Sequence, residues 1–187
     1  ESNKKSSMRI FLVGFMASGK SSVARRLARR LGFTYVDTDR LVEQDAGMGI
    51  ARIFEMEGEA AFRIREQKAL GKTLEMEQVV VATGGGLPCV GDNMQRMLGS
   101  GRVVYLCMAP ESLVYRLEYS RKRRPLADGL KGEALLNMVN ERLAVREPYY
   151  KQAHCIIRGE SLRLSQLLNL LFGEESLPGQ FRIGSDG

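Results

Sequence analysis

The sequence predicts an α/β fold in which helices cover a five-stranded parallel sheet. Five short apolar stretches alternate with helical patterns along most of the chain, as in sheets whose strands are joined by right-handed helical crossovers. The first stretch, residues 10–15, is apolar throughout, which is typical of a parallel strand covered on both faces. Polar or glycine-rich segments follow the first three stretches, at the edge of the sheet where such folds bind ligands.

The first helix is expected at residues 20–31, where apolar residues recur at helical spacing and arginines occupy the outer face. Gly32 can end this helix. Further strands are expected at residues 34–36, 79–82, 103–106 and 155–157. Further helices are expected as two short pieces within residues 41–57, and at residues 58–74, 92–98, 110–118, 133–150 and 162–172.

A length of 187 residues suits one domain. We expect this domain to span residues 1–173, and we expect residues 174–187, which are rich in Gly, Pro and Ser, to form a loose tail. Residues 119–132 interrupt the alternation of strands and helices. They are basic, contain two glycines and have few apolar side chains.

The chain carries 28 basic and 22 acidic residues, a net charge of +6. This balance is compatible with a nucleic acid, a membrane surface or a small anionic substrate. No apolar run approaches the ~18 residues of a membrane span, and there is no signal-peptide pattern. Three widely spaced cysteines indicate a reducing compartment rather than a disulfide or zinc framework. We therefore expect a cytoplasmic protein, and a structural role for the single histidine, His154.

The motif G-x-x-x-x-G-K-S at residues 14–21 follows the first strand and opens the first helix, as a phosphate-binding loop requires. Gly14 and Gly19 let consecutive backbone N–H groups point at one anion, and the helix adds the positive end of its dipole. Lys20 can reach the β- and γ-phosphates, and the Ser21 hydroxyl can bind Mg²⁺. The alternative is a glycine-rich turn that only joins a strand to a helix.

Asp37 and Asp39 flank Thr38 at the end of the second strand. In an extended chain their side chains face the same side. One carboxylate can hold the Mg²⁺ shell, and the other can accept a hydrogen bond from an attacking hydroxyl. The alternative is that Asp39 caps the following helix and Asp37 is solvated.

Gly84, Gly85 and Gly86 follow the third strand. Three glycines in a row lose much entropy on ordering, which indicates close approach of the backbone to a ligand. The alternative is a flexible turn.

Arg63 and Glu66 lie three residues apart on a predicted helix. Their spacing alone favours a surface ion pair, although Arg63 could instead face a substrate anion while Glu66 fixes its guanidinium. Arg146, near the end of another helix, could be an ordinary C-terminal cation.

The basic run at residues 121–124 could bind nucleic acid, or it could belong to a mobile lid that brings an arginine onto a transferring phosphate. No aromatic residues interleave this run, which argues against nucleic acid.

In this order, the motifs resemble those of the shikimate kinase family. The resemblance covers roughly residues 8–172. Each motif alone is weak evidence for the family, but all six in this order are specific for it. They are the loop at residues 14–21, Asp37-Thr38-Asp39, Phe62-Arg63-x-x-Glu66, Gly84-Gly85-Gly86, Arg124-Pro125-Leu126 and Arg146-x-Pro148-x-Tyr150.

The resemblance implies the P-loop kinase fold of nucleoside monophosphate kinases, a three-layer sandwich with sheet order 2-3-1-4-5. A substrate-binding insert is then expected at about residues 40–75 and a moving lid at about residues 119–132. The implied activity is ATP-dependent phosphorylation of the 3-hydroxyl of shikimate, on the route to aromatic amino acids. ATP and Mg²⁺ are the implied cofactors. We expect a monomer that binds neither nucleic acid nor a membrane.

The resemblance also assigns residues to roles. The catalytic residues would be Lys20, Asp39 and Arg124, and Mg²⁺ would be held by Ser21 and Asp37. The nucleotide would contact Gly14, Ala17, Ser18, Gly19, Lys20, Ser21, Ser22, Arg124 and, more loosely aligned, Arg163. Shikimate would contact Asp39, Arg63, Gly84, Gly85, Gly86 and Arg146, with the two arginines on its carboxylate.

Two positions depart from the family pattern. Ala17 stands where the family usually has glycine, and Arg116-Leu117 stands near where many members have Arg-Thr. Two other functions remain open at this point: a gluconate or nucleotide kinase of the same fold, and a nucleotide-dependent switch or nucleic-acid-binding ATPase. No N-K-x-D guanine-binding signal supports the second.

Overall fold

The computed structural model describes residues 8–121 and 124–173. Its five strands form one parallel sheet with the order β2-β3-β1-β4-β5, which confirms the predicted fold class. The strands are β1 (Arg9–Val13), β2 (Thr34–Asp37), β3 (Val79–Ala82), β4 (Arg102–Cys107) and β5 (Cys155–Arg158). The helices are α1 (Lys20–Leu31), α2 (Thr38–Ala46), α3 (Ile50–Leu74), α4 (Asn93–Ser100), α5 (Pro110–Glu118), α6 (Gly132–Tyr150) and α7 (Leu164–Phe172).

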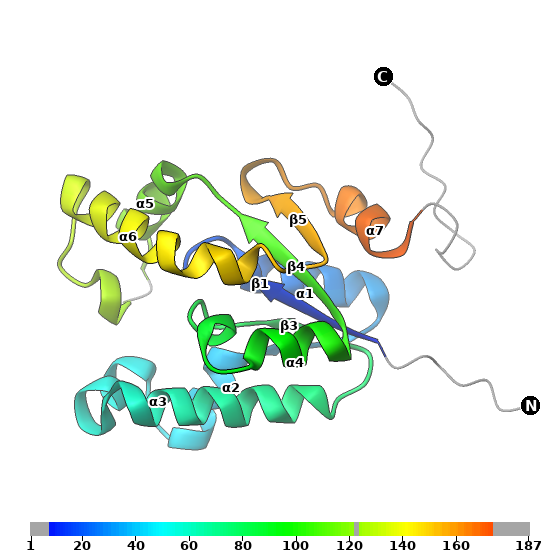
Figure 1. Cartoon of the computed structure of the whole chain (residues 1–187), viewed down its shortest axis with the longest axis horizontal. Coiled ribbons are helices and arrows are strands. Elements are labelled where there is room, and N and C mark those ends of the chain that lie inside the picture. The colour runs from blue at the N-terminus through cyan, green and yellow to red at the C-terminus, as the bar shows by residue number, and fades with distance from the viewer. Residues whose placement is uncertain (1–7, 122–123, 174–187) are drawn as a thin grey trace, which may run out of the picture.

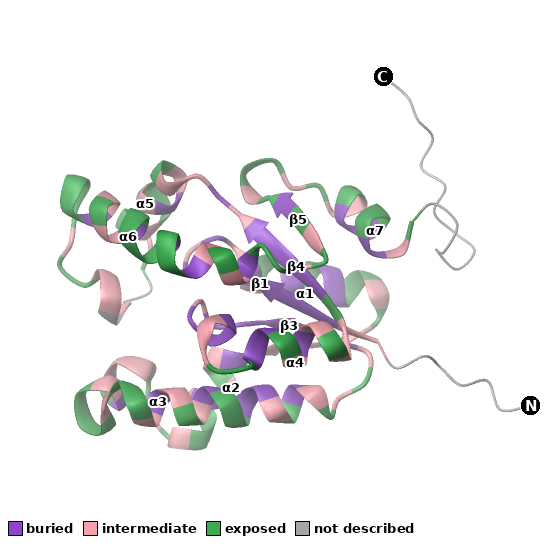
Figure 2. Cartoon of the chain, viewed as in Figure 1, coloured by how far each residue is buried: buried purple, intermediate pink, exposed green. Residues whose placement is uncertain are grey.

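The sheet is the middle of three layers (Figure 1). Alternate side chains of each central strand point to opposite faces, so each face carries its own apolar cluster. On one face, Phe11 and Val81 pack with residues of α3, α4, α5 and α6. On the other face, Leu12 and Val80 pack with residues of α1 and α7. Because both faces are covered, β3 is buried at every position, and Figure 2 shows the central strands as the buried layer.

The first strand is shorter than the sequence predicts. It was expected to run to residue 15, but β1 ends at Val13. Gly14 has a φ of 147°, which leaves the extended region, and the chain turns there into the loop. Helix α1 has the predicted bounds, and Gly32 ends it with a left-handed φ of 69° while its N–H bonds to the carbonyl of Ala28.

The helical insert after β2 also differs from the prediction. Two short helices and a longer one were expected, whereas α2 begins already at Thr38 and α3 runs from Ile50 to Leu74. The predicted boundary between residues 57 and 58 corresponds to a kink within α3, where Gly58 has a non-helical φ of 82° and ψ of 174°. A small apolar cluster joins α2 to both halves of α3; its buried members are Val42, Ile53, Phe62 and Ala69.

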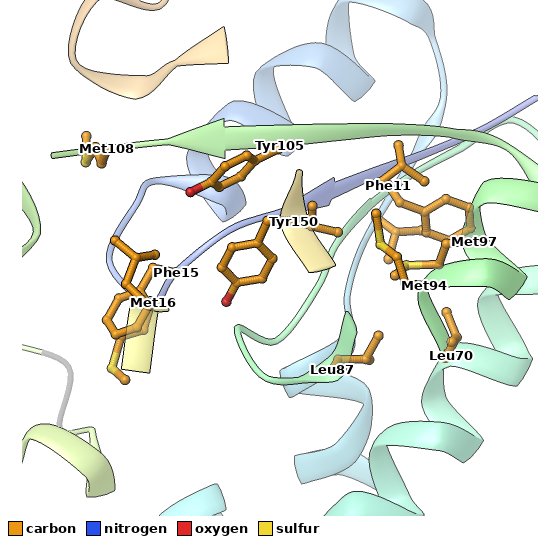
Figure 3. Packing of buried hydrophobic residues seen from close by; sticks show 14 of the residues in the cluster. Phe11, Phe15, Met16, Leu70, Leu87, Met94, Met97, Tyr105, Met108 and Tyr150 are labelled. Atoms are coloured by element: carbon orange, nitrogen blue, oxygen red, sulfur yellow. The ribbon is translucent and has the colours of Figure 1, made fainter. Parts of the chain in front are cut away.

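Two tyrosines join the core to the glycine-rich segment after β3. The rings of Tyr105 on β4 and Tyr150 on α6 lie 5.1 Å apart and belong to the cluster drawn in Figure 3. The Tyr150 hydroxyl donates a hydrogen bond to the carbonyl of Gly85. The end of α6 therefore fixes the position of this glycine.

None of the helices in the two described ranges combines the length and apolar character needed to cross a bilayer. The division into a core, an insert at about residues 40–75 and a lid at about residues 119–132 stays a prediction. The expected tail at residues 174–187, the segment 1–7 and residues 122–123 lie outside the described residues.

Candidate active site

The loops after β1, β2 and β3 meet at the carboxyl edge of the sheet, as parallel pairing requires. Figure 1 shows the β1 and β4 arrows pointing toward the side where α5 and the first half of α3 lie. Three predicted motifs are thereby brought together: the phosphate-binding loop, the two aspartates and the three glycines.

The loop at residues 14–21 needs glycine at two positions. A Cβ on Gly14 would lie 2.7 Å from the carbonyl oxygen of Leu106, and its φ of 147° disfavours any other residue. Gly19 has a φ of 94°. Ala17, where the family usually has glycine, also lies in the left-handed region with a φ of 64°. The departure noted in the sequence therefore falls on a position where a Cβ is strained.

Lys20 is buried in this loop. Its Nζ donates hydrogen bonds of 2.8 Å to the Gly14 carbonyl and 2.7 Å to the Phe15 carbonyl. Burial, and after it the charge of Arg124, lower the pKa of Lys20 to about 7, against the opposing effect of Asp39 and Asp37. A phosphate group beside Nζ would favour the charged lysine.

Ser21 and the two aspartates form the second part of the site. The Ser21 hydroxyl donates a 2.8 Å hydrogen bond to Asp37 Oδ2, and Asp37 Oδ1 accepts a 3.0 Å bond from the backbone N–H of Asp39. Asp37 is thus the N-cap of α2. The alternative in which Asp39 caps the helix is wrong, because β2 extends to Asp37 and α2 begins one residue later.

The hydroxyl of Ser21 and the carboxylate of Asp37 are oxygen ligands of the kind that Mg²⁺ binds, usually together with substrate phosphates and water. Among residues 8–121 and 124–173, no group of three or more His, Cys, Asp or Glu side chains could hold a metal by itself. The pair therefore fits a Mg²⁺ ion that is shared with a nucleotide.

The three glycines leave room for charged side chains. A Cβ on Gly84 would lie 2.7 Å from Asp39 Oδ1 and 2.8 Å from Glu66 Oε1, and one on Gly86 would lie 2.6 Å from Arg63 Nη1. None of the three has a positive φ, so glycine is needed here for space rather than for backbone conformation. The N–H of Gly84 bonds to the Thr38 hydroxyl at 2.8 Å, which argues against a flexible turn.

Arg63 and Glu66 do not form a surface ion pair. Arg63 Nη1 donates a 2.5 Å bond to Glu66 Oε2, and Nη2 lies 3.1 Å from Glu59 Oε1. Glu66 is only 1% exposed. Burial raises the pKa of Glu66 to about 7 although Arg63 opposes that shift. The carboxylate is thus well placed to fix the Arg63 guanidinium.

Arg146 is also an interior residue, with 6% of its surface exposed. Its guanidinium lies over the Phe15 ring, with Cζ 5.5 Å from the ring centroid, and its Nη1 would lie 3.4 Å from a Cβ on Gly85. An ordinary cation at a helix end would be solvated, so this alternative does not describe Arg146.

Two cavities adjoin at the edge of the sheet. The smaller, of about 260 Å³, is lined by both arginines, and the larger, of about 530 Å³, is lined by residues of the phosphate-binding loop with Asp37. Four residues line both cavities: Met16, Asp39, Gly85 and Arg124.

Arg124 therefore stands where the two cavities meet. Its Nε is buried and has no hydrogen-bond partner among the described residues. Burial lowers the pKa of Arg124, and the carboxylates of Asp39 and Asp37 oppose the shift. The unpartnered Nε is a donor available to an anion at the junction.

The assignment of Arg163 stays a prediction. It precedes α7 and lines neither cavity. Tyr115 and Tyr119 also line the larger cavity and were not expected from the sequence, whereas Arg116, which lines it with them, was noted there only as a departure from the family pattern. Nor did the sequence predict the apolar lining of the smaller cavity, which includes Ile50, Phe54, Phe62 and Leu126. His154 accepts a bond from the Val103 N–H, in keeping with its expected structural role.

Known proteins are similar to this chain in sequence and in fold. The family model for shikimate kinase matches residues 16–171. A shikimate kinase of Parabacteroides distasonis is 39% identical over 154 residues, which are 82% of this chain and 89% of that protein. The crystal structure of shikimate kinase from Bacteroides thetaiotaomicron superposes with a TM-score of 0.84 at 34% identity, covering 88% of this chain and 98% of that one.

Two further solved structures are informative. Shikimate kinase from Acinetobacter baumannii in complex with shikimate has a TM-score of 0.82 at 33% identity and covers 91% of this chain and 96% of that one. A gluconokinase from Sinorhizobium meliloti has a TM-score of 0.55 at 16% identity, covering 89% of this chain and 90% of that one, and shares the fold alone. The motifs, the fold and these matches together show that the chain belongs to the shikimate kinase family.

Proposed function

We propose that this chain transfers the γ-phosphoryl group of ATP to the 3-hydroxyl of shikimate. The products are shikimate 3-phosphate and ADP, and the step belongs to aromatic amino acid biosynthesis. Membership of the shikimate kinase family supports this activity. A relative of similar fold is known in complex with shikimate.

The observation that carries the proposal is the pair of adjoining cavities. The larger contains Lys20 and its loop, and the smaller contains Arg63 and Arg146. Asp39 and Arg124 line both. A triphosphate in the first and a carboxylate-bearing acceptor in the second would therefore meet at one acidic and one basic side chain.

The smaller cavity suits a small hydroxylated acid. Arg63 and Arg146 can bind its carboxylate through charge-assisted hydrogen bonds, each of which contributes about 1.5–3 kcal/mol. Apolar side chains such as Ile50 and Phe54 line the same cavity and can pack against a carbon ring. Glu66 holds Arg63 in place, so less entropy is lost when the acceptor binds.

Catalysis of this kind depends mainly on positioning and electrostatics. Asp39 orients the acceptor hydroxyl and takes its proton. Lys20 and Arg124 stabilise negative charge on the transferring group from the two sides of the junction. Ser21 and Asp37 would hold Mg²⁺ together with the nucleotide, and the ion would supply further positive charge.

We also propose that the chain acts as a cytoplasmic monomer that requires neither a nucleic acid nor a membrane. Part of its positive charge faces the cavities, where Lys20, Arg63, Arg124 and Arg146 are found. Binding of a small anionic substrate therefore accounts for part of the chain's net positive charge. Light scattering during size-exclusion chromatography tests the monomer, and a dimer at micromolar concentration would contradict it.

The activity is tested by measuring ADP release with a panel of acceptors. With ATP and Mg²⁺, we expect rapid release with shikimate and background release with gluconate and nucleoside monophosphates. The Arg63→Ala and Arg146→Ala variants should each raise the KM for shikimate, because each removes one carboxylate partner. Faster release with gluconate or a nucleoside monophosphate than with shikimate would overturn the proposal.

A further inference from the structure

Two tyrosines line the larger cavity together with residues of the phosphate-binding loop. Tyr115 lies on α5 and Tyr119 follows that helix directly. Their rings are in contact, with centroids 4.7 Å apart and planes tilted by 45°. They are 65% and 73% exposed, respectively. The pair therefore presents a broad aromatic surface that no described part of the chain covers.

Packing of the core does not explain this pair. In α5 the buried residue is Leu113, which already attaches the helix to the sheet through the main apolar cluster. Other large apolar side chains are exposed on α3, α6, β5 and α7, but none of those lines either cavity. Among the described residues, Tyr115 and Tyr119 are the only exposed aromatic residues that line either cavity.

The same short segment reaches the phosphate-binding loop. Arg116, which lies between the two tyrosines in sequence, donates a 3.5 Å hydrogen bond from Nη1 to the carbonyl of Ala17. The larger cavity is thus lined both by the loop and by the aromatic pair. A nucleoside triphosphate carries matching groups, namely charged phosphates for the loop and a flat base for the aromatic rings.

We propose that Tyr115 and Tyr119 form an aromatic platform on which the base of the nucleotide stacks. This inference rests on the assignment of the larger cavity to ATP. Every base has a π-face, so stacking on tyrosine adds affinity without reading hydrogen-bonding groups. The platform acts on binding of the nucleotide rather than on the transfer step, because neither tyrosine lines the smaller cavity.

The test compares ATP with inorganic tripolyphosphate, which has the phosphates but no base. Binding of each, with Mg²⁺ present, is measured by calorimetry for the wild type and for Tyr115→Ala, Tyr119→Ala and the double variant. We expect the Kd for ATP to rise about 10-fold in the double variant. The Kd for tripolyphosphate should stay within about twofold of the wild-type value.

Two further variants make the comparison specific. Tyr115→Phe with Tyr119→Phe keeps both rings and should restore ATP binding. Val145→Ala shortens an exposed side chain on α6 that lines neither cavity, and it should change neither affinity. Thermal unfolding verifies that all variants fold.

Two results would overturn the platform: an unchanged Kd for ATP in the double variant, or an equal loss of affinity for ATP and tripolyphosphate. The second result would mean that the tyrosines act through the loop. Failure of the proposed function would look different, because ATP would bind and depend on the tyrosines while shikimate caused no ADP release.

Discussion

The hydroxyl of Ser21 lies 2.8 Å from Asp37 Oδ2 and donates a hydrogen bond to it. This contact joins the residue after the loop lysine to the end of β2 and places two oxygen ligands side by side. Asp37 has a second task, since its other oxygen caps α2. The two tasks can be separated, because asparagine caps helices about as well as aspartate but carries no charge.

Asp37→Asn should therefore fold normally and require more Mg²⁺. We expect the Mg²⁺ concentration for half-maximal activity to rise about 10-fold, because one charged oxygen ligand is lost. Titrating MgCl₂ at saturating ATP and shikimate measures it. Asp92→Asn, at the N-cap of α4, is the matched control and should leave the titration unchanged. An unaltered Mg²⁺ requirement in Asp37→Asn would exclude Asp37 as a ligand.

Lys20 should take up a proton when ATP binds. Its pKa is lowered to about 7 by burial, so at pH 8 it is mostly neutral, and phosphate oxygens that favour the charged form raise the pKa again. Calorimetry at pH 8 in two buffers of different ionisation enthalpy should show uptake of close to one proton. Lys20→Arg, which stays charged, should abolish the uptake. Binding without proton uptake by the wild type would contradict the argument.

Asp39→Asn should lower kcat without weakening ATP binding. Loss of a general base costs about 100- to 10,000-fold in rate, whereas the nucleotide is held chiefly by the loop. Steady-state kinetics give kcat, and calorimetry gives the Kd for ATP. The control is Asp45→Asn, which removes a carboxylate of the same helix that pairs with Arg65 and Lys68 at the surface. A near-normal kcat in Asp39→Asn would remove Asp39 from the mechanism.

Gly86→Ala should weaken binding of shikimate specifically. The new Cβ would lie 2.6 Å from Arg63 Nη1, so the guanidinium must move away from its bonded position. We expect the KM for shikimate to rise about 10-fold, as for the loss of one charge-assisted bond, with the KM for ATP unchanged. In Gly99→Ala the Cβ meets open space within α4, and both constants should stay the same. Equal behaviour of the two variants would show that Arg63 does not bind the acceptor.

Ala17→Gly should stabilise the protein. Ala17 has a φ of 64°, where a Cβ costs about 1–2 kcal/mol, and the larger entropy of glycine in the unfolded chain offsets about half of that. The free energy of unfolding in urea should rise by up to about 1 kcal/mol. Gly47→Ala introduces a Cβ at a φ of 66° with open space around it, and it should lower the same quantity. A loss of stability in Ala17→Gly would mean that the loop is not strained there.

Local patterns in the sequence determined the architecture. Apolar runs such as residues 79–82 and the helical spacing of residues 20–31 depend only on neighbours along the chain, and both elements have the predicted bounds. The loop at residues 14–21 was equally readable, because Gly14 and Gly19 both have a positive φ, which is a property of the local backbone within one strand–loop–helix unit. The resemblance then supplied the sheet order that the structure confirms.

The tertiary structure alone decided which polar side chains are buried and which of them meet. Spacing favoured a surface ion pair for Arg63 and Glu66 on α3. Glu66 is nevertheless buried, and its carboxylate fits only because Gly84, which follows β3, has no Cβ. Tyr115 and Tyr119 carry no local signal, because their exposure beside the loop follows from how α5 packs against α6 and the main apolar cluster. Burial and the meeting of distant residues are set by contacts between elements far apart in sequence, and local periodicity does not encode those contacts.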